Sequence, residues 1–251
     1  MYGFSRRGML AAAALAAAGL PGASLLAESG AGEPRKLRVV VAGGHPGDPE
    51  YGCGGTVARY TALGHEVVLL YLNRGGEGIA GKSVEGAEAI RTAEARRACE
   101  MLKARPVFAG QADGRSVVDE EHYRSFHALL AAENPDVVFT QWPIDGHPDH
   151  RATAVLTHEA WQRMNKKCAL YYYEVTNGED TQHYFPQHYV DISAVKETKR
   201  AACFAHASQA PEKFYVWQEQ VARFRGLESG HEQAEAFIRH VQSPDSPFPP
   251  A

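Results

Sequence analysis

The chain has 251 residues, of which 44% are hydrophobic and 22% are charged, enough for one sizeable core. This length and composition fit a single α/β domain, although two domains are possible. The formal net charge is −4, and nucleic acids or anionic membranes are bound by clustered Lys and Arg. We therefore expect a small-molecule or glycan partner, with no nucleic acid. Oligomeric state stays open.

The first 31 residues have the pattern of a twin-arginine export signal. Arg6 and Arg7 precede an apolar run from Met9 to Leu20, and small residues follow near Ser29. This run is too short to span a bilayer comfortably, so a retained anchor is the weaker alternative. We expect a periplasmic or extracellular protein with no membrane contact beyond the signal. Removal of this signal would take away Arg6, Arg7 and Glu28 and change the formal net charge from −4 to −5.

Apolar runs and helical periodicity alternate along the rest of the chain. Buried strands are predicted at 37–42, 66–72, 135–140, 169–175 and 188–193, and helices at 55–63, 85–103, 118–132, 150–164, 195–207 and 212–224. This alternation predicts a Rossmann-like α/β fold, a mostly parallel sheet with helices on both faces, as a single domain over 32–243. Residues 244–251 are predicted to be a disordered tail. The four cysteines are widely spaced without a CxxC pair, which favours buried thiols over a disulfide framework.

Two loops that follow predicted strands are rich in metal-ligating residue types. His45 and Asp48 lie in the first, and His147, Asp149 and His150 lie in the second. Each histidine taken alone is more often a surface or core residue. In folds of this class, however, sites lie beyond the carboxyl ends of the strands, so the joint position favours a metal site. A catalytic zinc needs about three such ligands and an open position.

These loops carry a family resemblance. HPGDPEYGCGGT, NRGGEG and GHPDHRAT, with DIS, HASQ and AEAF later in the chain, resemble the PIG-L/LmbE-like family of zinc-dependent N-deacetylases. The resemblance implies a zinc ion held by His45, Asp48 and His150. It also implies that His147 stabilises the oxyanion, with Asp149 orienting a protonated ring. The implied activity is hydrolysis of an N-acetyl or other N-acyl group on an amino sugar or related small amide.

The sequence departs from the family at the catalytic base. The family's first motif reads HPDDE, and the Asp that serves as general base is Gly47 here, while the Glu is Pro49. Three interpretations stay open. Asp145, or else Glu50, replaces the base; the metal suffices at a lower rate; or the protein is a non-catalytic metal-dependent carbohydrate-binding protein. General-base help is worth about 10²–10⁴-fold in rate.

Other site predictions concern substrate and metal. Arg74 in NRGGEG is predicted to contact substrate, with a solvated loop arginine as the alternative. Trp142 is predicted to stack on a sugar, although packing explains it equally well. GCGGT matches neither the GxGxxG nor the P-loop pattern, so a nucleotide-binding oxidoreductase is the weaker interpretation. Two histidines and one carboxylate also suit ferrous iron and other divalent ions, so zinc is implied chiefly by the resemblance.

Overall fold

The strands of the computed structural model, which describes residues 35–175 and 180–245, form one seven-stranded sheet in the order β3-β2-β1-β4-β5-β7-β6. Strands β1 to β5 run parallel, and β7 is antiparallel to both of its neighbours. The strands are β1 (Arg38–Gly43), β2 (Glu66–Asn73), β3 (Arg105–Gln111), β4 (Val137–Gln141), β5 (Ala169–Tyr173), β6 (His188–Asp191) and β7 (Ala234–Arg239). The predicted mostly parallel sheet is confirmed.

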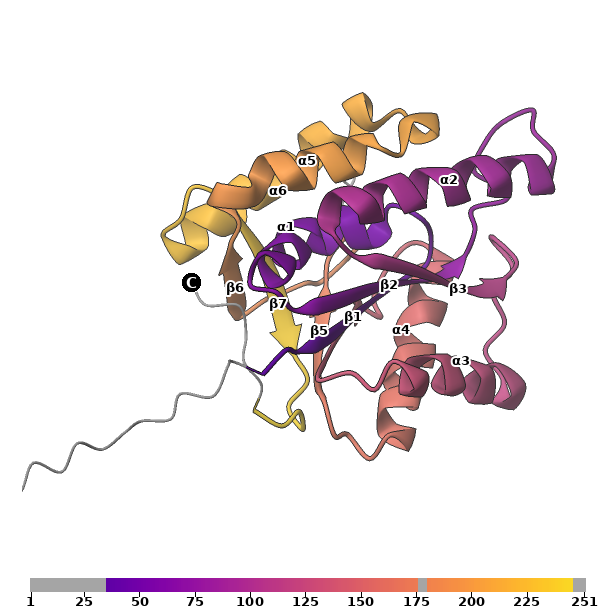
Figure 1. The fold of residues 1–251 in the computed structure, drawn as a ribbon, viewed down its shortest axis with the longest axis horizontal. Helices are drawn as coiled ribbons and strands as arrows, with labels where there is room; N and C mark the ends of the chain where they lie inside the picture. The colour runs from indigo at the N-terminus through magenta and orange to yellow at the C-terminus, as the bar shows by residue number, and fades with distance from the viewer. Residues whose placement is uncertain (1–34, 176–179, 246–251) are drawn as a thin grey trace, which may run out of the picture. The chain divides into compact units, whose positions relative to one another are not determined.

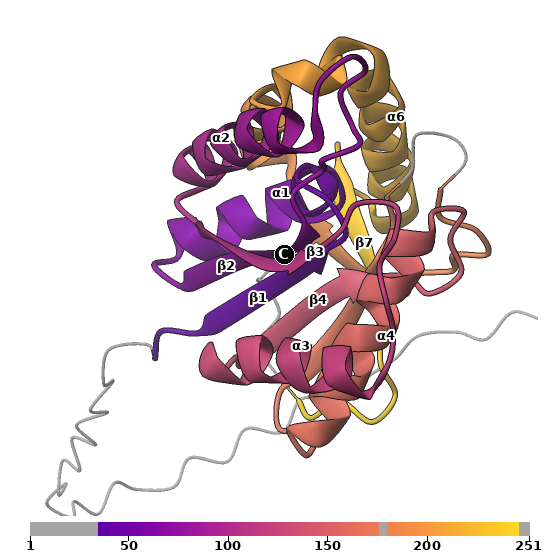
Figure 2. The ribbon, with the colours of Figure 1, turned by 90° about the vertical axis from the view of Figure 1, so that its right-hand side faces the viewer.

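Six α-helices of the described residues cover the two faces of the sheet. They are α1 (Asp48–Ala62), α2 (Val84–Leu102), α3 (Glu120–Ala132), α4 (Pro148–Arg163), α5 (Lys196–Phe204) and α6 (Pro211–Ser229). Figures 1 and 2 show α1, α2, α5 and α6 on one face and α3 and α4 on the other. The predicted single α/β domain with helices on both faces is confirmed, and the described residues from Lys36 onward form one compact unit.

Each face of the sheet has its own hydrophobic core, because successive side chains of a strand point to opposite faces. Val39 and Val41 of β1 pack with α1 and α2, whereas Val40 and Ala42 pack with α3 and α4. Strands buried on both faces appear as continuous apolar runs, which is why β1, β2 and β4 could be predicted. All four cysteines are buried and unpaired, as expected.

Two strands were not predicted, and both have sequences untypical of a central strand. Strand β3 contains Pro106, which is tolerated because β3 is an edge strand that pairs only with β2. Strand β7 contains Glu235, whose buried carboxylate accepts hydrogen bonds from the Gly55 amide (2.8 Å) and from Lys199 Nζ (2.6 Å). These hydrogen bonds compensate for the burial of the Glu235 charge. Sequence patterns alone would predict a surface position for this glutamate.

Helix α1 begins at Asp48, seven residues before the predicted start at Gly55. Its glycines lie inside the helix, where they allow close packing. A Cβ at Gly52 would lie 2.3 Å from Tyr173 Cδ2, and one at Gly55 would lie 2.5 Å from Ile192 Cγ2. The motif glycines therefore bring α1 close to the sheet and to the segment before α5.

The predicted export signal, residues 1–31, and the end of the predicted tail, residues 246–251, lie outside the described residues. Within the ranges that are described, no helix combines the length and the apolar character needed to cross a bilayer.

Candidate metal centre

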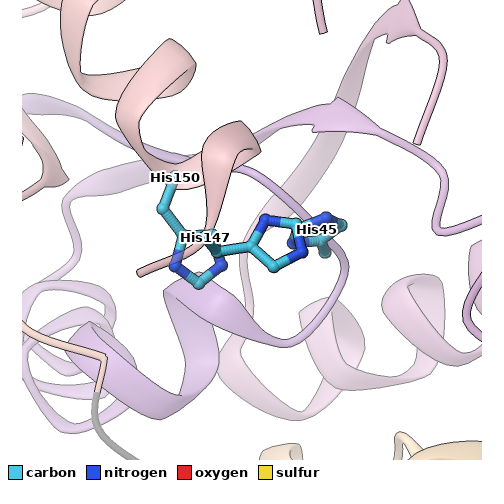
Figure 3. Close-up of side chains that lie close together, drawn as sticks. All are labelled: His45, His147 and His150. Carbon is cyan, nitrogen blue, oxygen red and sulfur yellow. The ribbon is translucent and has the colours of Figure 1, made fainter. Parts of the chain in front are cut away.

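The two histidine-bearing loops meet where the strand order reverses. Strands β1 and β4 are adjacent and parallel, with Ala42 beside Thr140. From β1 the chain continues to β2 and β3 on one side, whereas β4 leads to β5 on the other. The loops that follow β1 and β4 therefore lie side by side, at the position where doubly wound folds bind ligands. Figure 3 shows His45, His147 and His150 gathered there.

Asp48 is at the centre of this cluster. Its Oδ2 atom lies 3.2 Å from His45 Nδ1 and 3.2 Å from His150 Nε2. The same oxygen accepts hydrogen bonds from the His45 amide (2.8 Å) and from Gln141 Nε2 (3.2 Å). Gln141 also accepts a hydrogen bond from the Gly44 amide at 2.8 Å, which joins the end of β4 to the loop after β1.

Carboxylates contact the ring nitrogen of each of these two histidines that does not face Asp48. His150 Nδ1 lies 3.0 Å from Asp145 Oδ1. His45 Nε2 lies 3.1 Å from Asp149 Oδ2 and 3.0 Å from Asp113 Oδ1. A carboxylate at one ring nitrogen fixes the proton there and leaves the other nitrogen as a donor for a metal.

The electrostatics of the cluster match a cation site. Burial alone would lower the pKa of His150, but Asp48 and Asp145 outweigh it and raise that pKa to about 9. Burial likewise opposes protonation of His45, yet Asp48, Asp113 and Asp149 raise its pKa well above the ordinary value. The pKa of Asp48 is held low, against its burial, by His150 and His45. A divalent cation would replace these protons as the positive charge between the carboxylates.

The donor set fits a divalent metal ion. His45 Nδ1 and His150 Nε2 both lie 3.2 Å from Asp48 Oδ2, and carboxylates support the other nitrogen of each ring. His147 is a further nitrogen donor close by, since ligand atoms of His45, His147 and His150 all lie within 4.8 Å of one another. The structure thus brings together the three predicted metal ligands and the predicted oxyanion-binding histidine.

His147 is half-buried and precedes α4 as its N-cap residue. Its Nδ1 atom accepts a hydrogen bond from the Asp149 amide (3.2 Å), so the ring proton belongs on Nε2. Burial, together with His45 and His150, lowers the pKa of His147. A neutral ring with a proton on Nε2 is therefore expected, in place of the protonated ring that the resemblance implied.

The side chain of Asp149 does not take its predicted position beside His147. It is fully buried and contacts His45, Asn73 Nδ2 (3.0 Å) and the Gly114 amide (2.8 Å). Burial would raise the pKa of Asp149, but the hydrogen bonds from His45 and Gly114 outweigh it and lower that pKa. The Asp149 carboxylate therefore supports His45, whereas its backbone amide donates the hydrogen bond to His147.

The two predicted replacements for the base have other contacts. Asp145 Oδ1 contacts His150 and accepts a hydrogen bond from the His147 amide, while Oδ2 accepts one from Thr181 Oγ1. Glu50 is fully buried and accepts hydrogen bonds from Tyr71 Oη (2.7 Å), the Gly47 amide (3.1 Å) and His206 Nε2 (3.0 Å). These contacts indicate that both carboxylates hold neighbouring groups in place: Asp145 holds His150, and Glu50 holds His206 and the Gly47 amide.

The predicted substrate-binding residues point elsewhere. Arg74 donates a hydrogen bond to Thr92 Oγ1 (3.2 Å), and its guanidinium lies 4.3 Å from the centre of the Phe108 ring. Trp142 packs edge-on against Tyr172 and Tyr184, with ring centres 5.5 Å and 5.9 Å away. Packing explains the position of both side chains.

A cavity of about 380 Å³, here called the metal cavity, opens above the cluster and includes residues that sequence reasoning missed. Buried Arg91 of α2 lies between Gly75 and Gly78 and donates a hydrogen bond to the Pro46 carbonyl at 2.7 Å. No signal in the helical pattern distinguished this arginine. The residues lining the metal cavity are His45, Asp48, Glu77, Gly78, Arg91, Asp113, Gly114, His147, His150, Asp180 and Gln209.

Asp113 follows β3 and was missed together with that strand. Its Oδ2 atom accepts a hydrogen bond from the Glu77 amide at 2.9 Å, while Oδ1 contacts His45. Burial opposes ionisation, but the contact with His45 outweighs it and lowers the pKa of Asp113. Asp113 is thus an ionised carboxylate on the wall of the metal cavity.

Replacing Asp145 by asparagine distinguishes a positioning residue from a general base. We expect metal affinity to fall about 10–100-fold, the usual effect of losing a carboxylate behind a metal-binding histidine. The turnover rate at saturating metal should then stay close to that of the unaltered protein. Metal titration of both proteins provides the measurement. A loss of about 10²–10⁴-fold that persists at saturating metal would instead identify Asp145 as the base.

Comparisons with known proteins agree with this site and fold. Residues 39–161 match the PIG-L family, described as GlcNAc-PI de-N-acetylase. Diacetylchitobiose deacetylase of Thermococcus kodakarensis is 31% identical over 215 residues, which cover 78% of this chain and 80% of that protein. The family description and the name of the Thermococcus protein both refer to removal of N-acetyl groups.

Two solved structures have the same fold. The conserved protein TT1542 of Thermus thermophilus has a TM-score of 0.73 and 27% identity, covering 86% of this chain and 100% of that one. N,N'-diacetylchitobiose deacetylase of Pyrococcus horikoshii, complexed with its inhibitor, has a TM-score of 0.72 and 24% identity, covering 81% and 84%. With its motif loops assembled at the strand ends, the chain belongs to the PIG-L family.

Proposed function

We propose that this protein is a metal-dependent N-deacetylase that hydrolyses the N-acyl group of an amino sugar. The observation that carries the proposal is the meeting of His45, Asp48 and His150 donor atoms at a cavity, with carboxylates behind both histidines. A divalent ion held there, zinc by family resemblance, would polarise the acyl carbonyl and acidify a water molecule. Membership of a family of deacetylases supports the same reaction.

Individual residues of this chain have distinct roles in the proposed reaction. Neutral His147, with its proton on Nε2, donates a hydrogen bond to the oxyanion that develops at the acyl carbon. Asp145 and Asp149 hold His150 and His45 in position. Gly47 offers no carboxylate, and Asp113 on the cavity wall is engaged with His45 and the Glu77 amide, so the proposed reaction proceeds without the family's general base, at a rate lowered by about 10²–10⁴-fold.

The metal cavity has the chemistry to bind a sugar. Glu77, Arg91, Asp113 and Asp180 on its walls provide charged donors and acceptors for hydroxyl groups. Arg91 Nε is buried and has no hydrogen-bond partner among the described residues. Diacetylchitobiose, the substrate in the name of the Thermococcus relative, is a suitable first compound.

The proposal is tested by acetate release from N-acetylglucosamine and its oligomers, including diacetylchitobiose. The protein is first stripped with a chelator and then reconstituted with Zn²⁺, Fe²⁺ or Mg²⁺. We expect release only from reconstituted protein, because the metal supplies the electrophile. Equal release from the stripped and reconstituted forms would contradict metal dependence. The ion that restores the highest rate identifies the best candidate for the resident metal.

Gly47 favours a second candidate, a metal-dependent carbohydrate-binding protein without catalysis. In that case reconstituted protein would bind these sugars in calorimetry, and chelation would abolish the binding. No acetate would be released over many protein equivalents of substrate. The same samples therefore distinguish the two functions.

We also propose export through the twin-arginine route, on the sequence pattern of residues 1–31. Fractionation of a bacterial host that expresses the full chain tests this proposal. A paired Arg6→Lys and Arg7→Lys variant should stay in the cytoplasm. Equal export of both forms would contradict the assignment.

A further inference from the structure

A second cavity of about 220 Å³, here called the acyl cavity, adjoins the metal cavity. The two share four lining residues, namely Asp48, Arg91, Asp180 and Gln209. Asp48 is a proposed metal ligand, so the acyl cavity begins beside the reacting centre. A substrate amide at the metal has two substituents, the acyl group and the amine-bearing sugar, and two adjoining cavities are available for them.

The two cavities differ in polarity. Apart from the shared residues, the described walls of the acyl cavity include Tyr51, Val175 and Phe214, and among the described residues they contain neither a carboxylate nor a guanidinium. His206 and Gln218 also line it. The Nε2 atom of His206 contacts Glu50, and its Nδ1 atom has no hydrogen-bond partner among the described residues. The residues that line only the metal cavity, by contrast, include the carboxylates of Glu77 and Asp113. A sugar hydroxyl needs hydrogen-bonding partners, whereas an aliphatic chain gains free energy from apolar walls.

Gly47 lies on the wall of the acyl cavity. A Cβ atom at this position would lie 3.8 Å from Tyr51 Cδ2 and 3.9 Å from His206 Cγ, both in residues that line the cavity. A side chain at Gly47 would therefore occupy space beside Asp48. The residue that removes the usual carboxylate also opens the cavity next to the metal centre.

We propose that this cavity binds the acyl chain of the substrate and that the protein prefers linear N-acyl groups longer than acetyl, such as butanoyl or hexanoyl. This inference rests on the proposed N-deacylase function. Water adds to the acyl carbon and the C–N bond breaks, so that the products are the fatty carboxylate and the free amine. The sugar occupies the metal cavity, and the aliphatic chain occupies the space beside Gly47, Tyr51 and Phe214.

The test compares N-acetyl-, N-butanoyl- and N-hexanoylglucosamine as substrates of the Zn²⁺-reconstituted protein, with release of the free amine as the readout. We expect kcat/KM to rise about fourfold for each added methylene that the cavity buries. Dissociation constants of the three compounds, measured by calorimetry, provide an independent readout. A fastest reaction with the acetyl compound would overturn the acyl-cavity assignment and leave the proposed hydrolysis intact.

Failure of the proposed hydrolysis gives a different result from failure of the acyl-cavity assignment. Absence of turnover for every compound, together with tighter binding of longer chains, would overturn hydrolysis and support the cavity assignment. Equal affinities without turnover would overturn both.

A matched pair of variants on α6 locates the effect. Phe214 lines the acyl cavity and is 42% exposed, whereas Phe224 lies outside it and is 54% exposed. We expect Phe214→Ala to reduce the ratio of butanoyl to acetyl kcat/KM severalfold, because the chain loses an apolar wall. Phe224→Ala should leave that ratio unchanged. The same ratio in both variants and the parent would overturn the assignment, and since both rings are half-exposed, both variants should fold.

Discussion

Replacing His150 by alanine is expected to remove the bound metal and with it all metal-dependent hydrolysis. His150 supplies Nε2 to the donor group around Asp48 Oδ2, and its other nitrogen contacts Asp145. The variant lacks one of the three proposed ligands and leaves the Asp145 carboxylate without this partner. The loss of metal affinity should therefore exceed the about 10–100-fold that a supporting residue costs. Metal content after gel filtration and acetate release provide the two measurements.

Two further histidine variants serve as controls for this experiment. His147→Ala should retain the metal yet lose activity by about 10²–10³-fold, the usual effect of removing one oxyanion donor. His158, on the same helix α4 but packed against Trp161, should be replaceable without effect on the metal. Loss of metal from His147→Ala, with retention by His150→Ala, would exchange the roles of the two histidines.

Replacing Gly47 by aspartate is expected to increase turnover of the acetyl substrate, by about 10²-fold relative to Gly47→Asn. The substitution restores a carboxylate at the position where the family has its general base, which is worth about 10²–10⁴-fold. We expect the lower end of this range, because a Cβ here faces Tyr51 and His206 and the carboxylate must turn toward the metal.

Asparagine is the matched control, since it has the same shape and the same backbone strain but cannot accept the proton. Gly47 has a φ of 112°, which side-chain-bearing residues rarely adopt. Such strain costs about 1–3 kcal/mol, so both variants should unfold at a lower temperature than the parent by a similar amount. Equal activity of the two variants, at equal stability, would show that the missing carboxylate does not limit this protein.

The sequence by itself determined the fold class and the loops that form the site. Strands β1, β2 and β4 could be predicted because burial on both faces demands continuous apolar runs. The rule that sites lie beyond the carboxyl ends of such strands then predicted that the two histidine-bearing loops lie together, and the family resemblance selected His45, Asp48 and His150 among their residues. Family resemblance added the chemistry and exposed the departure at Gly47.

Only the tertiary structure decided which carboxylate supports which histidine. Asp145, Asp149 and His150 are near neighbours along the chain, but the turn into α4 directs Asp149 to His45 and Asp145 to His150. Side-chain direction at a helix start depends on backbone angles that residue spacing does not specify.

Long-range packing decided the rest of the site. Strand β3 could not be predicted because it contains Pro106 and forms a strand only through pairing with β2. Asp113, which follows this strand, was missed for the same reason. Arg91 has an ordinary helical position in the sequence and becomes a cavity residue because α2 packs beside the loop after β1. Local patterns report which residues are buried and which chemistry they carry, whereas contacts between distant segments determine where each functional group points.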